Sequence, residues 1–204
     1  MIAVLDYGIG NLRSAQKGLE RVGADARLTA DPDEVAAADG VVLPGVGAFG
    51  RCMQALREAK LEEPALDAIE RSLPFLGICV GMQMLYEGSD EDPGTPGMGV
   101  LPGWVRRLPD GVKRPQMQWN RLDPRADSPL LAGLGDPAWV YFVHSFAPEP
   151  TPDVVATCDY GGPMVAAVQR GTLWATQFHP EKSSASGLRL LANFVAATGG
   201  ARPG

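Results

Sequence analysis

Short apolar runs alternate with amphipathic segments in the first half of the chain. Four runs have the length and composition of buried strands: residues 2–5, 26–29 and 41–43, and a run that begins at 74 and leads into the segment 77–81. Between them, apolar residues recur at helical spacing, and helices are expected over 12–22, from 31, from 51 to about 58, over 64–72 and over 82–86. Strands that alternate with helices in this way predict a parallel sheet covered on both faces.

The second half of the chain is mostly strand-like, with turn signals between the strands. The strands are expected at residues 104–108, 116–122, 139–147, 154–159, 164–169 and 173–178. A final amphipathic segment predicts a helix over 184–197. We therefore expect an α/β fold, with a mostly parallel central sheet, helices on both faces and additional antiparallel strands in the C-terminal half. No linker-like segment divides the chain, so residues 1–204 are predicted to form a single domain.

Charge and cysteine content narrow the functional classes. The net charge of −6 argues against nucleic-acid binding and membrane-surface binding, which call for clustered basic residues. Three cysteines show no spacing typical of a disulfide framework or a zinc site, so no metal is expected. The N-terminus lacks a basic segment followed by a long apolar run, which argues against a signal peptide. A cytoplasmic location is expected.

The segment Gly77-Ile78-Cys79-Val80-Gly81 has the form of a nucleophile elbow, in which a reactive residue lies between a strand and a helix. Flanking glycines are needed because a Cβ beside such a strained residue would collide with the neighbouring backbone. A cysteine at the start of a helix is also favoured in its reactive thiolate form. By contrast, Cys52 and Cys158 lack this context and are expected to be packing residues.

A general base for Cys79 is expected in the segment His179-Pro180-Glu181. Proline should hold this segment extended, so that the side chains of His179 and Glu181 point to the same side. Glu181 could then orient the imidazole and stabilise its charged form, as the third member of a catalytic triad. The two motifs are 179 − 79 = 100 residues apart, so only the fold can bring them together.

The loop after the third strand, residues 45–50, matches Gly-x-Gly-x-x-Gly and admits two interpretations. One is a dinucleotide site, but this fingerprint normally follows the first strand of its unit, and no second strand with a suitable acid follows. The other is an oxyanion hole, for which Val46 or Gly47 would supply one backbone N–H and Val80 the other. We favour the oxyanion hole.

With these residues placed, the chain resembles the class I (triad) glutamine amidotransferases, and within them the glutaminase subunits of imidazole glycerol phosphate synthase. The matching segments are residues 6–11, 43–49, 77–83, 117–120, 141–146 and 177–183. The segment Pro-Gly-Val-Gly at 44–47 is the most telling of these for this subfamily. The chain departs from the usual pattern at Gln116, Gln118 and Phe146, and these departures leave the expected chemistry intact.

The resemblance implies that glutamine is hydrolysed to glutamate and ammonia through a γ-glutamyl thioester on Cys79, with no cofactor. It also implies a set of residues that hold glutamine, namely Gln83, His144, Ser145 and Phe146. Ammonia would pass to a cyclase subunit, a (β/α)8 barrel, in a heterodimer that makes the imidazole ring in histidine biosynthesis. The residues implied at that interface are Asn11, Trp119, Asn120, Tyr141 and Lys182.

Three alternatives remain at this stage, and the weakest of them is a cysteine peptidase of the same fold. The chain could be a glutaminase that serves another synthase, such as pyridoxal phosphate synthase, with the same triad but a different partner. It could also be a dinucleotide-binding module built on the glycine loop. The acidic run at residues 87–92 is expected to be a solvated loop with no part in the chemistry.

Overall fold

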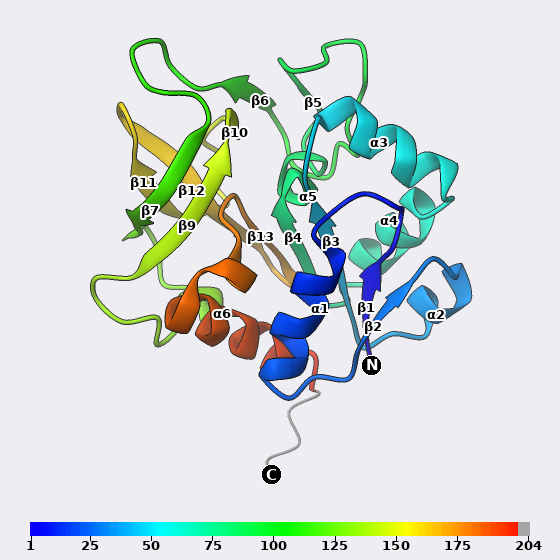
Figure 1. Cartoon of the computed structure of the whole chain (residues 1–204). Helices are drawn as coiled ribbons and strands as arrows, with labels where there is room; N and C mark the ends of the chain where they lie inside the picture. The colour runs from blue at the N-terminus through cyan, green and yellow to red at the C-terminus, as the bar shows by residue number, and fades with distance from the viewer. Residues whose placement is uncertain (200–204) are drawn as a thin grey trace.

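A computed structural model describes residues 1–199 and shows an α/β fold built on an eight-stranded sheet. The strand order is β2-β1-β3-β4-β13-β12-β11-β8. The first five of these strands are parallel, and the last three join antiparallel. Figure 1 shows the parallel strands flanked by helices, with the antiparallel strands grouped beside them. The expected fold class is confirmed.

The strands and helices follow one another along the chain in the order of their labels. The strands are β1 (Ile2–Leu5), β2 (Ala26–Thr29), β3 (Gly40–Gly45), β4 (Phe75–Cys79), β5 (Gly88–Ser89), β6 (Trp104–Arg107), β7 (Gln116–Arg121), β8 (Asp123–Pro124), β9 (Trp139–His144), β10 (Phe146–Pro148), β11 (Val154–Asp159), β12 (Pro163–Arg170) and β13 (Leu173–Thr176). The helices are α1 (Leu12–Arg21), α2 (Pro32–Ala36), α3 (Phe49–Glu58), α4 (Glu62–Glu70), α5 (Val80–Gln83) and α6 (Ser184–Ala197), with 3-10 turns η1 (Pro129–Leu131) and η2 (Pro180–Lys182).

The parallel half of the sheet follows the sequence pattern closely. β1, β2 and α6 have the predicted bounds, and β3 contains the predicted run at 41–43. Helix α4 begins at Glu62, two residues before the predicted start at Pro64. A proline is tolerated in the first turn because the N–H groups there have no intrahelical partner. The prediction erred by taking the proline itself as the first helical residue.

The predicted strand over 139–147 is two strands that belong to different sheets. β9 pairs with β7 as an antiparallel ribbon, whereas β10 pairs with β6 in a three-stranded sheet that also contains β5. The chain changes direction at Ser145, whose carbonyl accepts a hydrogen bond from the N–H of Leu108. The apolar character continues through this break because both strands are partly buried, so periodicity alone could not reveal it.

The eight-stranded sheet spans both halves of the sequence, with its core on both faces. A single domain over 1–204 stays a prediction, and residues 200–204 of it lie outside the described residues. Within 1–199, no helix has the length and apolar character that a membrane span requires.

Candidate active site

Cys79 ends β4 and precedes α5, with backbone angles of φ 55° and ψ −111°. A non-glycine residue with positive φ is strained and persists only where its surroundings enforce it. A Cβ on Gly81 would lie 1.9 Å from the backbone oxygen of Leu43, and one on Gly77 would lie 3.0 Å from the backbone oxygen of Gly81. Both flanking positions therefore require glycine for steric reasons, as the sequence predicted.

The helix after Cys79 is shorter than expected. It ends at Gln83 rather than extending to residue 86, so α5 is a single turn of four residues. The macrodipole of so short a helix is small, and a thiolate at Cys79 depends more on nearby individual groups than on the helix. Those groups come from β9 and from the segment after β13.

His179 and Glu181 form the predicted pair. The Nδ1 atom of His179 lies 2.8 Å from Oε1 of Glu181, and the two side chains are 1% and 2% exposed. The local geometry differs from the prediction, however. Pro180 begins the 3-10 turn η2 rather than continuing an extended segment, and only His179 has extended backbone angles. Proline suits the first position of a helical turn, and this turn folds the Glu181 carboxylate back onto the imidazole.

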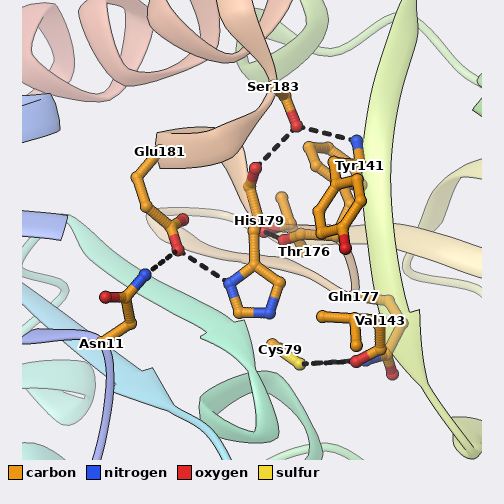
Figure 2. Close-up of polar contacts among 10 residues, drawn as sticks. Asn11, Cys79, Tyr141, Val143, Thr176, Gln177, His179, Glu181 and Ser183 are labelled. Atoms are coloured by element: carbon orange, nitrogen blue, oxygen red, sulfur yellow. Dashed lines mark hydrogen bonds and ion pairs between the residues drawn. The ribbon is translucent and has the colours of Figure 1, made fainter. Parts of the chain in front are cut away.

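The second ring nitrogen of His179 faces the sulfur of Cys79 (Figure 2). This Nε2 atom is buried and has no hydrogen-bond partner among residues 1–199. Burial by itself lowers the pKa of His179, but the Cys79 sulfur and the Glu181 carboxylate outweigh it and raise the pKa to about 10. His179 is therefore protonated at neutral pH, which is the form that can donate a proton to a leaving group.

Asn11 does not cap α1 with its side chain, contrary to the expectation for a residue before a helix. Its backbone carbonyl accepts from Ser14 and Ala15, while its side-chain amide donates to Oε1 of Glu181 at 3.3 Å (Figure 2). Asn11 thus contacts the buried carboxylate, and a position at a partner interface stays a prediction.

The Pro44–Gly47 segment is the loop predicted to form an oxyanion hole, and it packs closely against the elbow. A Cβ on Gly45 would lie 2.6 Å from the backbone nitrogen of Gly81. The thiol of Cys52 donates to the Val46 carbonyl at 3.4 Å, and the buried Tyr7 hydroxyl donates to the Pro44 carbonyl. The position of this segment is therefore held by side chains on both sides of it.

The start of α3 is covered by an acidic loop, which disfavours the dinucleotide interpretation. The backbone N–H of Phe49 donates to the Glu91 carboxylate at 2.8 Å, and a Cβ on Gly50 would lie 2.0 Å from Oδ2 of Asp92. A dinucleotide site needs free N–H groups at this position for a pyrophosphate. Two carboxylates occupy that space instead and would repel an anionic ligand.

One cavity of about 240 Å³ joins these parts. It is lined by every residue that we predicted to be catalytic, oxyanion-binding or substrate-binding except Glu181, which lies behind His179: Val46, Gly47, Cys79, Val80, Gln83, His144, Ser145, Phe146 and His179. The fold thus brings together segments from both halves of the chain around one reactive sulfur.

Glu91, Pro115 and Val143 also line the cavity, and the sequence analysis missed them. Glu91 belongs to the acidic run that we expected to be a solvated loop with no part in the chemistry. Its side chain is exposed, but it stands at the cavity mouth because the loop returns over the oxyanion segment to the start of α3. The run is also not wholly a solvated loop, because Gly88 and Ser89 within it form the buried strand β5.

His144 is a buried neutral residue in the cavity wall. Burial lowers its pKa to about 4, and the positive charge of His179 acts in the same direction. Nδ1 lies 2.8 Å from the Phe146 carbonyl, and Nε2 lies 2.9 Å from the side-chain amide of Gln116. Gln116, one of the departures from the usual pattern, is therefore buried behind the cavity rather than on a partner-facing surface.

The β7–β9 ribbon exposes an apolar face. In its register, Met117 pairs with Val143, Trp119 with Tyr141 and Arg121 with Trp139, so these side chains share one face. Met117, Trp119 and Trp139 are 62%, 46% and 49% exposed. Of the other residues predicted at an interface, Lys182 is exposed in η2, whereas the Asn120 side chain donates to the Asp159 carbonyl on the opposite face of the ribbon.

Comparisons with known proteins agree with this geometry. Residues 3–198 match the family model described as glutamine amidotransferase class-I. A protein from Synechococcus sp. (strain JA-3-3Ab) named imidazole glycerol phosphate synthase subunit HisH is 53% identical over 95% of this chain and 92% of its own length. One of the same name from Methanothermobacter thermautotrophicus is 51% identical over 96% of this chain and 98% of its own length.

Solved structures share the fold at lower sequence identity. A glutamine amidotransferase structure superposes with a TM-score of 0.75 at 24% identity, over 97% of this chain and 98% of that one. The PurLQS structure from Thermotoga maritima gives a TM-score of 0.76 at 21% identity, over 96% and 97% of the two chains. The elbow, the histidine–glutamate pair and the match over nearly the whole sequence lead to one conclusion: the chain belongs to the class I glutamine amidotransferases.

Proposed function

We propose that this chain is the glutaminase subunit of an imidazole glycerol phosphate synthase and hydrolyses glutamine through Cys79, His179 and Glu181. The main observation in support of this chemistry is that Cys79 and the His179–Glu181 pair lie together at one cavity. Relatives named HisH, about half identical over nearly the full length, support the choice of synthase.

The first half of the reaction begins with the Cys79 thiolate. It attacks the side-chain amide carbon of glutamine, a C–S bond forms, and the carbonyl electrons move to oxygen. As this oxyanion collapses, the C–N bond breaks and the Nε2 proton of His179 passes to the leaving nitrogen, which departs as ammonia. A γ-glutamyl thioester remains. Splitting one difficult amide cleavage into two steps is the gain of covalent catalysis.

In the second half, neutral His179 takes a proton from water, and the hydroxide equivalent attacks the thioester. Collapse of this intermediate breaks the C–S bond, releases glutamate and restores the thiolate beside protonated His179. Glu181 stays charged throughout and stabilises the imidazolium in both halves. The cycle needs protonated His179 in its first half, and the raised pKa of this imidazole favours that form.

Backbone N–H groups of Val80 and of Val46 or Gly47 would bind the oxyanion. The carbonyl of the Val46–Gly47 peptide points to Cys52, and the C=O and N–H of a trans peptide point in opposite directions. The Gly47 N–H is therefore directed away from Cys52. Gly47 has φ 97°, and apart from its chain neighbours no atom lies within 4 Å of where a Cβ would stand, so the space on that side of the residue is open.

Gln83 and Glu91 suit the polar ends of glutamine. The Gln83 side-chain amide uses both of its N–H groups, on the Phe146 carbonyl and on the side chain of Gln177, so only its oxygen is left to accept from a substrate N–H. The Glu91 carboxylate at the cavity mouth is placed to bind the α-ammonium group. Ser145 and Phe146 complete the wall that holds the substrate.

The partner in this proposal is a cyclase subunit of the (β/α)8 barrel class, in a heterodimer. Ammonia released into water is protonated and loses its nucleophilicity, so a covered route to the partner is needed. The exposed apolar face of the β7–β9 ribbon, which carries Trp119, Tyr141 and Trp139, offers a docking surface of the aromatic composition common in interfaces. The three unpaired cysteines agree with a reducing compartment such as the cytoplasm.

The test is glutamate release from glutamine by the purified chain, alone and with an imidazole glycerol phosphate synthase cyclase subunit and its nucleotide ligand. We expect strong stimulation by the cyclase and no release by Cys79→Ala under either condition. Hydrolysis that ignores the cyclase would assign the chain to another synthase, such as that for pyridoxal phosphate. Activity retained by Cys79→Ala would overturn the chemistry itself.

A further inference from the structure

Gln177 is a buried polar side chain that the proposed cycle does not use. It is fully buried and lies two residues before His179, immediately after β13. Its side-chain nitrogen lies 3.7 Å from the Cys79 sulfur, within hydrogen-bond distance for sulfur, and its side-chain oxygen accepts from Gln83 at 3.0 Å. Figure 2 shows Gln177 and Val143 on the side of the sulfur away from Glu181.

The orientation of this amide follows from its neighbours. The carbonyl oxygen of Phe146 can only accept, so the Gln83 group 2.9 Å away must be the NH₂ end of its amide. The same nitrogen meets Gln177, which must therefore present its oxygen to Gln83. The NH₂ end of Gln177 is then left facing Cys79. The Phe146 carbonyl thus fixes the orientation of Gln83, and Gln83 in turn fixes the orientation of Gln177, so that an N–H of Gln177 points to the sulfur.

Two groups around the sulfur favour opposite protonation states. The Val143 carbonyl lies 3.9 Å away and can accept from a thiol but would repel a thiolate. The Gln177 N–H can donate to a thiolate, and a hydrogen bond to a charged group is stronger than one to a neutral group. Because Gln177 is buried and held by Gln83, no rearrangement is needed when the charge forms.

We propose that Gln177 is a further catalytic residue, whose side-chain N–H donates to the Cys79 thiolate and stabilises it. This inference rests on the proposed function, in which Cys79 is the nucleophile. The two hydrogen-bonded amides then have different roles. The side-chain oxygen of Gln83 accepts from the substrate, and the side-chain N–H of Gln177 donates to the attacking sulfur.

The experiment measures carboxamidomethylation of Cys79 by iodoacetamide from pH 5 to 10 in the full chain, with peptide mass mapping to separate the three cysteines. Gln177→Met keeps the volume and removes the donor. We expect the pH midpoint of Cys79 labelling to rise by about one unit, with labelling about tenfold slower below the midpoint. Gln116→Met is the matched control, since it makes the same exchange at a fully buried glutamine that contacts His144 rather than Cys79.

Thermal unfolding of each variant establishes that it folds. If Gln177→Met does not fold, the same labelling is measured on Gln177→Glu. This variant keeps the shape and the oxygen that accepts from Gln83, but it places a negative charge beside the sulfur. Its midpoint is expected to rise further. An unmoved midpoint in either folded variant, or an equal rise in Gln116→Met, would overturn the inference. Failure of the proposed function is distinct, since wild-type Cys79 would then show no selective labelling and no glutamate release.

Discussion

Replacing Glu181 by glutamine tests what the buried carboxylate does for His179. The two side chains are almost fully buried and joined by a 2.8 Å contact, and Glu181→Gln keeps the shape while removing the charge. The introduced amide can still accept the Nδ1–H of His179 through its oxygen. What is lost is the interaction of a full negative charge with the imidazolium.

The expected loss follows from the strengths of the two hydrogen bonds. A bond to a charged group contributes about 1.5–3 kcal/mol, against about 0.5–1.5 kcal/mol for a neutral one. The difference of about 1.4 kcal/mol corresponds to roughly a tenfold fall in kcat. In a Ser-His-Asp triad the equivalent change costs about 10⁴, because the amide enforces the wrong histidine tautomer. We expect a smaller loss here, for a reason that lies at Asn11.

The Asn11 side chain donates to the same oxygen of Glu181 that receives His179. In Glu181→Gln this donor favours the orientation in which the introduced oxygen, not the NH₂, faces both residues. The correct tautomer of His179 is thus preserved. Asn11→Ala alone should cost little, but the double variant Asn11→Ala/Glu181→Gln frees the amide to turn, so its loss in kcat should exceed the product of the two single losses.

The assay is steady-state glutamate release in the presence of the cyclase subunit, with kcat and KM determined for the wild type, both single variants and the double variant. Because Glu181 acts through His179, kcat should fall and KM should stay close to the wild-type value. A rise in KM with an unchanged kcat would mean that Glu181 binds substrate. Strictly multiplicative losses would refute the orienting role of Asn11.

Three further outcomes are expected. The pKa of His144 is lowered to about 4 from an ordinary 6.5, so the unfolded chain takes up a proton at a higher pH than the folded one. About 3 kcal/mol of the free energy of unfolding is therefore lost as pH falls from 6.5 to 4. In urea unfolding, His144→Asn should not show this loss. Glu91→Gln should raise KM for glutamine several-fold with kcat little changed, as initial rates can check, and equal KM values would exclude contact with the substrate ammonium. Gly81→Ala should destabilise the protein by about 1–3 kcal/mol in the same urea assay, because its Cβ would overlap the Leu43 carbonyl, and unchanged stability would refute the steric argument.

The positions of the three proposed catalytic residues were predictable because each lies in a motif whose constraint is local. The glycines beside Cys79 mark a backbone conformation that few other sequences tolerate, and the structure shows the backbone atoms that they avoid. The contact between His179 and Glu181 was also predicted, although by the wrong geometry. A spacing of two residues is compatible with both an extended segment and a 3-10 turn, and proline is tolerated in both. The sequence pattern therefore could not distinguish the two conformations.

Features that depend on tertiary contacts were out of reach. Glu91 looked like one acid in a solvated run, because nothing within the run shows that the loop returns to the N-terminus of α3. The break at Ser145 was hidden for a related reason, since β9 and β10 are both partly buried on sheets that the sequence pattern does not distinguish. Gln177 lies in the matching segment 177–183, but that match assigned no chemistry to it. Its proposed role follows only from its contacts with Gln83 and Cys79 in the folded chain.

The order of three neighbouring strands explains how segments so far apart in sequence form one site. β3, β4 and β13 are adjacent and parallel, with Gly45 level with Cys79 and Thr176 level with Ile78. Their carboxyl ends therefore bring the Pro44–Gly47 segment, Cys79 and the Gln177–His179 segment to one edge of the sheet, where α/β proteins place their sites. Strands β9 and β10 lie between β4 and β13 in the sequence. They belong to other sheets and complete the cavity wall through Val143, His144 and Phe146.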